Sequence, residues 1–295
     1  IGALKINDDL AGTGAITLSG VGGVSTPKIG ITGNVDIGHD NTGSVTLNGT
    51  EYNIDGITTI RTTNVADKII IGGDLTLKTN DDNILFQRGG IHLNNNKNLT
   101  VRAGGGDVTL TNIGGTTHEV VDIEGETVTA AVIGSGDEIK SVKLDGSTKV
   151  VLGGNITTSN TTLNKVEIVG NAELTGNIAI NTSANNGLID FSGKIDSADA
   201  TKHSLTLTTA AGNVAVDNLI GSTRAIGALK INDNVGATGT IALTGIGNSG
   251  TPAAGVVGGV DIGHTATKGI DLSGGYYNID GAVVFTTAAN DGAGT

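Results

Sequence analysis

The sequence predicts an all-β fold, a parallel β-helix or β-solenoid with turns of about 24–25 residues. Three observations lead to this prediction. One 70-residue segment occurs twice, short apolar segments recur at a fixed spacing, and no window of ten or more residues shows helical periodicity. Apolar residues that alternate with polar ones at period two indicate half-buried strands, whereas a helix requires a period near 3.6 residues.

The first feature is a long internal repeat. Residues 1–70 align without a gap with residues 226–295, at an offset of 225, and 32 of the 70 aligned pairs are identical. His39 aligns with His264, and the segment 52–56 recurs unchanged as 277–281. A repeat that keeps its register through loops indicates a repetitive architecture. We therefore expect one long-period solenoid repeat over 1–225 and the start of a second copy over 226–295, in a continuous rod without a linker.

Composition determines what kind of core these repeats can build. Glycine contributes 49 of the 295 residues, Phe and Tyr contribute three each, and Trp, Met and Cys are absent. Large aromatic residues normally supply much of a globular core, at roughly 150–250 Å² each. Hydrophobic residues nevertheless make up 37% of the chain, which is too apolar for a disordered segment. The core is therefore expected to be thin and aliphatic.

The local pattern resolves into strand-turn-strand units. In three segments, two apolar pairs begin at an offset of nine, and Asn83, Asp107 or Asn213 stands directly before the second pair. Asn, Asp and Gly are turn residues that accept a positive φ. A second offset, of 24 in residue number, relates equivalent residues of different turns, as Leu75 to Leu99 and Leu205 to Leu229. The three units are 75–77 with 84–86, 99–101 with 108–110, and 205–207 with 214–216.

Further strands are expected along the rest of the chain. Each has apolar residues at alternate positions and is bounded by Gly, Asn or Asp, as in Leu4-Lys5-Ile6. Gly and Asn interrupt every candidate segment, so no helix is expected. In chain order these strands are 4–6, 16–18, 35–37, 45–47, 69–71, 120–123, 142–144, 166–168, 178–180 and 189–191.

Short strands at this spacing suit a sandwich, a barrel or a solenoid. The superposable unit favours the solenoid, because coiling at a fixed period stacks like strands on like strands. Nine turns of about 25 residues fit one repeat. At about 4.8 Å per turn, one repeat would advance by about 43 Å.

The unit sequences resemble those of a known group of proteins. The runs 73–79, 97–104 and 106–112 are similar to the repeats of filamentous-haemagglutinin-type exoproteins and of large autotransporter passenger domains. The resemblance extends over most of the chain. It implies a right-handed parallel β-helix that is exported to the bacterial cell surface and serves adhesion or a surface matrix.

The net charge of the chain indicates which kinds of molecule it can bind. The chain carries 29 acidic and 17 basic residues, a net charge of −12, and no two basic residues are adjacent. A nucleic-acid partner is not expected, because binding requires a basic stripe with stacking aromatics. Asp122, Glu124 and Glu126 alternate and would share one face of a strand. Calcium takes such oxygen ligands, so these three residues are weak calcium candidates, and a solvated outer face is the alternative. No other cofactor is predicted.

No catalytic arrangement is expected, and the chain is predicted not to be an enzyme. Asp122, Glu124 and Glu126 are the carboxylates available for acid–base chemistry, but no aromatic sugar platform accompanies them. Asp36 and His39 recur as Asp261 and His264, which suggests turn hydrogen bonds rather than a metal site, because two ligands are too few. The other histidines, at 92, 118 and 203, show no ligand spacing, and nucleotide-binding and hydrolase motifs are absent.

Three functions remain as hypotheses. The first is a structural extracellular filament or surface-matrix protein, and the second is the stalk of an adhesin, for which the irregular stretch 114–147 is the candidate insertion. The third is a β-helix enzyme that degrades polysaccharides. No apolar run is long enough for a membrane-spanning helix. Because residues 1–7 match a mid-chain turn, we also expect the rod to continue beyond both ends, covalently or by end-to-end or lateral self-association, with host or neighbouring-cell surfaces as the other candidate partners.

Overall fold

The structure is a computed structural model that describes residues 1–7, 13–22, 30–64, 68–116, 118–134, 139–159, 164–233, 236, 238–250 and 254–289. The described chain is 51% strand and forms a β-solenoid of about ten turns. It divides into two compact units, Ile1–Val150 and Val151–Thr295. The division falls within one strand and does not coincide with the start of the second sequence copy at residue 226. Each unit is described separately below.

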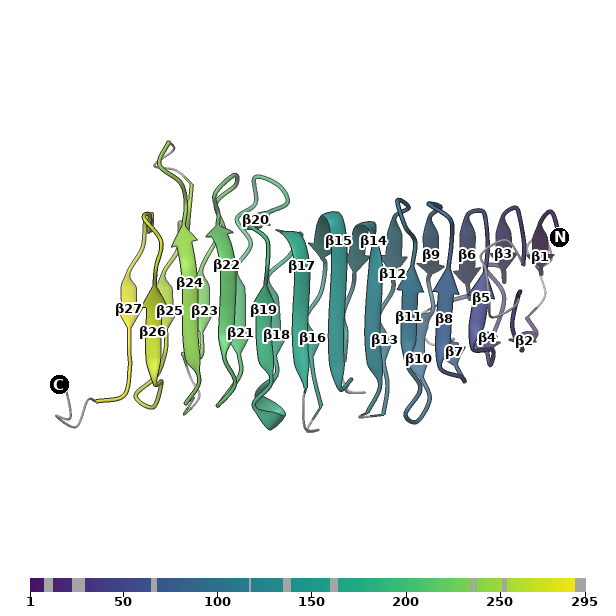
Figure 1. Cartoon of the computed structure of the whole chain (residues 1–295), viewed down its shortest axis with the longest axis horizontal. Helices are drawn as coiled ribbons and strands as arrows, with labels where there is room; N and C mark the ends of the chain where they lie inside the picture. The colour runs from purple at the N-terminus through teal and green to yellow at the C-terminus, as the bar shows by residue number, and fades with distance from the viewer. Residues whose placement is uncertain are drawn as a thin grey trace. The chain divides into compact units, whose positions relative to one another are not determined.

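The described part of the first unit contains fourteen strands and the start of a fifteenth, all short except the last two (Figure 1). They are β1 (Leu4–Ile6), β2 (Ala15–Leu18), β3 (Val35–Ile37), β4 (Ser44–Leu47), β5 (Glu51–Asn53), β6 (Thr58–Arg61), β7 (Lys68–Ile71), β8 (Leu75–Lys78), β9 (Ile84–Gln87), β10 (Gly90–Leu93), β11 (Leu99–Arg102), β12 (Val108–Leu110), β13 (Ile113–Gly114), β14 (Val120–Ala130) and β15 (Ser141–Leu152).

Each turn contributes three strands, which stack on the equivalent strands of the next turn. β8, β9 and β10 form one turn, and β11, β12 and β13 pair in parallel onto these three strands in the same order. Leu75 pairs with Leu99, and Ile84 with Val108, so the residue number rises by 24 at both steps. The predicted parallel solenoid is confirmed, and the structure adds that each turn has three sides.

The second unit also stacks its strands in parallel. Its strands after β15 are β16 (Ile156–Thr157), β17 (Lys165–Leu174), β18 (Ile178–Asn181), β19 (Leu188–Phe191), β20 (Ile195–Ser197), β21 (Leu205–Thr208), β22 (Val214–Ile220), β23 (Leu229–Ile231), β24 (Thr240–Ile246), β25 (Val260–Ile262), β26 (Gly269–Leu272) and β27 (Val283–Phe285). One face is a six-stranded parallel sheet in the order β16-β18-β21-β23-β25-β27. Among the described residues the one helical segment is a 3₁₀ turn, Ser183–Asn185, and no helix is long and apolar enough to cross a membrane.

The core consists of one layer of aliphatic side chains inside each turn. The pairs predicted to face inward are all buried, namely Leu75 and Leu77, Leu99 and Val101, Val108 and Leu110, and Leu205 and Leu207. Every strand predicted from alternation is present. Tyr52, Phe86 and Phe191 are the largest fully buried side chains, so half of the six aromatic residues lie in this thin core.

Turn length varies more than the sequence pattern predicts. Val108 pairs with Val128, an offset of 20 in residue number, whereas Leu4 pairs with Val35, an offset of 31. The paired strands of these turns still align apolar residue with apolar residue, as in Leu4 with Val35 and Val108 with Val128. The step from Leu229 to Val260 is also an offset of 31, so the long turn recurs at the same place in the second sequence copy.

Several strands run through corners of the solenoid without interruption. The first half of β14 pairs with β11 and its second half with β12, so this strand serves two faces. β17 pairs in the same way with β19 and then β20. Gly125 lies buried at the bend of β14, where a Cβ atom would come within 2.8 Å of the Gly106 carbonyl oxygen. The described strands of the stretch 114–147, which is the candidate insertion of the adhesin hypothesis, include β14, which stacks on β11 and β12 like the other turns.

Candidate functional site

The chemistry that recurs along this chain lies in the contacts between successive turns. At the corners, side-chain oxygens of one turn accept hydrogen bonds from backbone N–H groups of the next. Asp74 Oδ1 accepts from the Asn98 amide at 3.0 Å, and Asn98 Oδ1 in turn accepts from Val120 N–H at 2.8 Å. Such a side chain completes the hydrogen bonding that the strand ladder leaves open at a corner. We call these series polar ladders.

Polar ladders occur in both units and include the turn residues identified from the sequence. Asn83 Oδ1 accepts from Asp107 N–H at 2.9 Å, and Asp107 Oδ1 accepts from Thr127 N–H at 3.0 Å. In the second unit, Asn213 Oδ1 accepts from Thr240 N–H at 3.0 Å. The Asn or Asp that precedes the second strand of each strand-turn-strand segment is therefore a stacking residue, as in other in-register β structures.

The two sequence copies form the same hydrogen bonds. Tyr52 donates its hydroxyl proton to the Leu18 carbonyl at 2.9 Å, and Tyr277 donates to the Leu243 carbonyl at the same distance. Burial is the larger influence on the Tyr52 hydroxyl and raises its pKa, whereas a backbone hydrogen bond from Gly49 acts in the opposite direction. The repeat thus preserves a bond that bridges two neighbouring turns.

The Asp36-to-His39 motif also forms a turn in both copies. The His39 amide donates to Thr42 Oγ1 at 2.8 Å, and the equivalent His264 amide donates to Thr267 Oγ1 at 2.9 Å. Asp36 accepts two hydrogen bonds from Arg61 Nη2, both at 3.0 Å. This geometry agrees with the architectural interpretation of the motif. The backbone N–H of His39 forms the turn, and the Asp36 carboxylate accepts its hydrogen bonds from Arg61.

Gly38 lies inside this motif, and its position requires glycine for two reasons. Its φ is +83°, and a Cβ atom there would come within 2.1 Å of the Arg61 carbonyl oxygen. Gly263 has a φ of +85° and the same close approach to the Thr286 carbonyl oxygen. The left-handed conformation is accessible to glycine without a steric penalty, so the backbone of the next turn dictates this residue in both copies.

The three calcium candidates lie on the outer face of β14, as alternation predicts. Arg102 forms ion pairs with two of these carboxylates: its Nη2 lies 2.5 Å from Asp122 Oδ2, and its Nε lies 3.2 Å from Glu124 Oε2. Glu126 is exposed, and Thr148 donates to it at 3.5 Å. No group of three or more metal-ligating side chains occurs in the described part of the chain. Calcium binding at Asp122, Glu124 and Glu126 remains a prediction, against which a bound guanidinium competes.

Sequence reasoning missed one buried carboxylate, that of Glu119. Its oxygens accept from the Asn96 amide at 2.9 Å, the Thr116 amide at 2.8 Å and the His118 amide at 3.0 Å, and also from the Thr116 hydroxyl. These donors belong to two different corners, which the fully buried side chain joins. Glu119 directly precedes the apolar run of β14, and only the tertiary fold distinguishes it from the solvated acids nearby.

An acidic column lies on the outer face of the second unit. Glu167 and Asp190 are register partners on β17 and β19. Burial raises the pKa of the Asp190 carboxyl, Asp217 and Glu167 raise it further, and Lys165 acts in the opposite direction. Lys165 forms an ion pair with Glu167 at 2.8 Å. Asp190 Oδ1 is buried and has no hydrogen-bond partner within the described residues.

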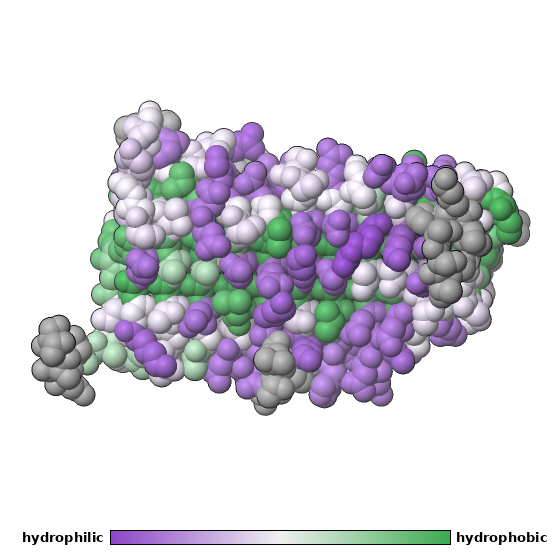
Figure 2. All heavy atoms as spheres, in the orientation of Figure 1, coloured by the Kyte–Doolittle hydropathy of each residue, from purple (hydrophilic) through white to green (hydrophobic). Residues whose placement is uncertain are grey.

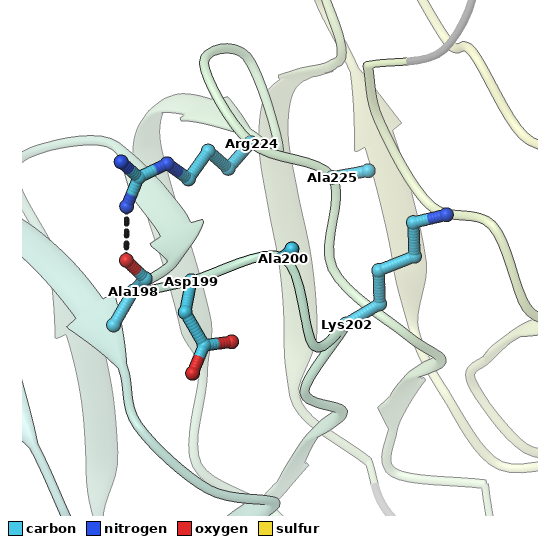
Figure 3. A pocket seen from close by; sticks show the side chains of 6 residues that line it. All are labelled: Ala198, Asp199, Ala200, Lys202, Arg224 and Ala225. Carbon is cyan, nitrogen blue, oxygen red and sulfur yellow. Dashed lines mark hydrogen bonds between the residues drawn. The ribbon is translucent and has the colours of Figure 1, made fainter.

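A surface groove in the second unit has a volume of about 710 Å³ and is lined by residues of the 198–202 loop together with Arg224 and Ala225. Arg224 donates to the Ala198 carbonyl, whereas Asp199 and Lys202 point away from each other (Figure 3). His203 Nε2 lies 3.5 Å from Asp199 Oδ1. The side chains do not converge on a common point, so they form no constellation for catalysis.

Comparison with known proteins gives no match: no family, no curated protein and no solved structure is similar to this chain at a significant level.

Proposed function

We propose that this protein is a structural component of an extracellular filament or surface matrix, built from tandem β-solenoid repeats at the bacterial cell surface. The observation that carries the proposal is the equivalence of the two sequence copies. Tyr52 and Tyr277, His39 and His264, and Gly38 and Gly263 make the same contacts with neighbouring turns. A repeat that preserves stacking contacts supports a protein whose function is to extend and stiffen a fibre.

The outer surface supports a passive role rather than catalysis. Charged side chains on β11, β14 and β15 neutralise one another, as in the pairs of Arg102 with Asp122 and of Lys143 with Asp145. The hydrogen bond from Lys143 to Asp145 is the largest influence on the lysine and raises its pKa, so the lysine stays charged. We therefore propose a non-enzymatic function, with self-association as the principal interaction.

The stalk of an adhesin is the alternative function. It uses the same solenoid, but it requires a binding region outside the regular turns. The 198–202 loop, which lines the groove of the second unit, is the described segment that suits such a region best.

Electron microscopy of the purified native protein tests the proposal. We expect long unbranched filaments, with labelling of intact cells by an antibody against the folded protein. Discrete particles that bind to cells or to matrix through one end would favour the adhesin stalk. Particles that neither assemble nor reach the cell surface would contradict both functions.

A further inference from the structure

One histidine of the second unit is buried although it ends an exposed loop. The loop connects β20 to β21, and hydrophilic residues are visible at the corners of this unit that lie at the top of the view (Figure 2). The side chains of residues 199–202 are exposed, whereas that of His203 is only 13% exposed. Its atom Nε2 is buried and has no hydrogen-bond partner within the described residues. A buried polar atom without a partner destabilises the structure that contains it.

An acidic side chain of the same loop lies within ion-pair distance of this nitrogen. Asp199 Oδ1 is 3.5 Å from His203 Nε2, and the same oxygen accepts a hydrogen bond from the Thr201 amide at 2.7 Å. At the base of the loop, the His203 amide donates to Ser197 Oγ at 3.0 Å. The Asp199 carboxylate therefore connects the exposed part of the loop to the buried histidine.

Neighbouring corners of the solenoid pack against the loop from both sides. The Gly227 amide of the next turn donates to the His203 carbonyl at 2.7 Å. The Ser204 amide donates to Asn177 Oδ1 of the preceding turn at 2.9 Å. Residues 175–177 of the preceding corner include no ionisable side chain. Charged groups therefore reach the histidine from its own loop, from the adjoining strands and from the next turn.

The other ionisable side chains of these elements are Glu173 on β17, Asp196 on β20, Lys202 in the loop and Arg224 in the next turn. Asp196 is the register partner of Glu173, and its Oδ1 accepts from two amides of the next turn at 2.9 and 3.2 Å. The Arg224 guanidinium donates to the Ala198 carbonyl, and Lys202 points away from Asp199 (Figure 3). Asp199 is thus the charged residue that forms the described ion pair with His203.

We propose that the charge of His203 is a pH-sensitive latch for the 198–202 loop. A neutral Nε2 is left without a hydrogen bond, whereas a protonated imidazole presents an N–H and a positive charge to the Asp199 carboxylate. Hydrogen bonds between ionised partners are shorter and stronger than neutral ones. Because the closed loop then binds the proton more tightly than an open loop, closure is favoured as the pH falls and is lost as the pH rises.

The latch acts on one wall of the groove described above. Asp199, Ala200 and Lys202 line this groove together with Arg224 and Ala225 of the next turn. Closing the loop fixes the positions of the first three side chains, whereas releasing it leaves this wall mobile. The groove should therefore be best defined in acid. This regulation goes beyond the proposed function and does not depend on it, because it applies equally to a fibre subunit and to an adhesin stalk.

Amide hydrogen exchange measured by NMR at pH 5.0 and pH 8.0 tests the latch, because histidine side chains change charge between about pH 5 and 8. Protection factors are compared, since they remove the intrinsic dependence of exchange on pH. The amides of Thr201 and His203 should be about threefold to fivefold better protected at pH 5.0, as expected for a pair with one exposed partner. The Ser183 amide, which donates to the neutral Asn181 Oδ1 at 2.9 Å, is the internal reference and should show equal protection at both pH values.

Two conservative variants identify the groups of the latch. Asp199→Asn keeps an oxygen for the Thr201 amide but removes the charge, at an exposed position that does not contribute to the core. His203→Gln keeps a polar side chain that does not titrate. Either substitution should abolish the difference between pH 5.0 and pH 8.0, whereas Lys202→Gln, in the same loop, should retain it.

Three results would overturn the inference. Equal protection of the wild-type loop at both pH values would show that protonation does not control the loop. A difference that persists in His203→Gln would assign it to another titratable group, and one that persists in Asp199→Asn would remove the carboxylate as the partner. Each of these results would leave the proposed function unaffected.

Discussion

At the scale of single residues, the fold depends on which side of a strand each side chain occupies. Inner positions are buried and mostly aliphatic, and many outer positions beside them carry Thr, Lys, Arg, Asp or Glu. The thin core gives each inner residue contacts mainly with the turns before and after it. A substitution therefore acts locally, and its effect changes from large to small between adjacent residues.

Val108 and Thr109 provide the sharpest comparison. Val108→Asp places an unpaired charge in the core of the first unit and should destabilise it by about 3–5 kcal/mol. Thr109→Asp, at the neighbouring outer position, should change stability by about 0.5 kcal/mol or less. Urea unfolding of the two variants measures the difference. Equal shifts in the unfolding midpoint would mean that the assigned facing of β12 is wrong.

Gly38 should not tolerate a side chain. Gly38→Ala introduces a Cβ atom that meets the Arg61 carbonyl oxygen at a positive φ, so the turn must distort, at a cost of about 1–3 kcal/mol. Gly176→Ala is the matched control, because a Cβ atom there meets nothing within 4 Å. Thermal unfolding should separate the two variants, and similar melting temperatures would contradict the close approach.

Asp190 makes stability depend on pH. Because its folded-state pKa is raised above the unfolded value, the folded state binds more protons between the two values, and stability falls as pH rises through that interval. Asp190→Asn should therefore stabilise the protein at pH 7, by less than about 1 kcal/mol for this partly exposed group. The gain should disappear as the pH is lowered below about 4.

At the scale of elements, corners rather than strands distinguish one turn from the next. Polar ladders continue the hydrogen bonding around the corners. The offset between stacked residues varies from 20 to 31 in residue number, and the pairing of β22 with β24 shifts register between Val216 and Leu219. Two corners are joined through the buried carboxylate of Glu119.

Glu119→Ala should leave the amides of Asn96, Thr116 and His118 without their acceptor in a buried site. We expect a loss of about 2–3 kcal/mol, since hydrogen bonds to charged groups contribute about 1.5–3 kcal/mol each and part of the loss is recovered by water. Amide exchange of Asn96 and Thr116 should accelerate, whereas Glu126→Ala, at an exposed position on the strand that follows Glu119, should leave both rates unchanged. Unaltered exchange in Glu119→Ala would argue against the carboxylate as the link between corners.

At the scale of the whole chain, each turn is stabilised chiefly by its immediate neighbours, so stability should be graded along each unit. In dilute solution the amides of β27 and β1 should exchange fastest with deuterium, and those of β9 and β12 slowest. Hydrogen exchange followed by mass spectrometry measures this gradient. Uniform protection from β27 through β23 would indicate all-or-none unfolding instead of graded opening.

The sequence by itself determined the fold class, the inward residues and the register of the repeat. These properties depend on local alternation, as in Leu99-Thr100-Val101, and on a stacking rule that acts between equivalent positions. It also indicated that His39 serves a turn. The number of strands per turn and the spread of turn lengths followed only from the tertiary structure. So did the continuous corner at Gly125, because glycine permits both a break and a bend.

The tertiary structure also decided what the charged residues do. Asp122 and Glu119 lie close together and look alike in the sequence, yet one is on the outer face beside Arg102 and the other is buried among backbone amides. Several of their partners come from a neighbouring turn, and the lengths of the intervening corners determine which groups meet. Local patterns specify the strands, whereas contacts between turns specify the chemistry of each carboxylate.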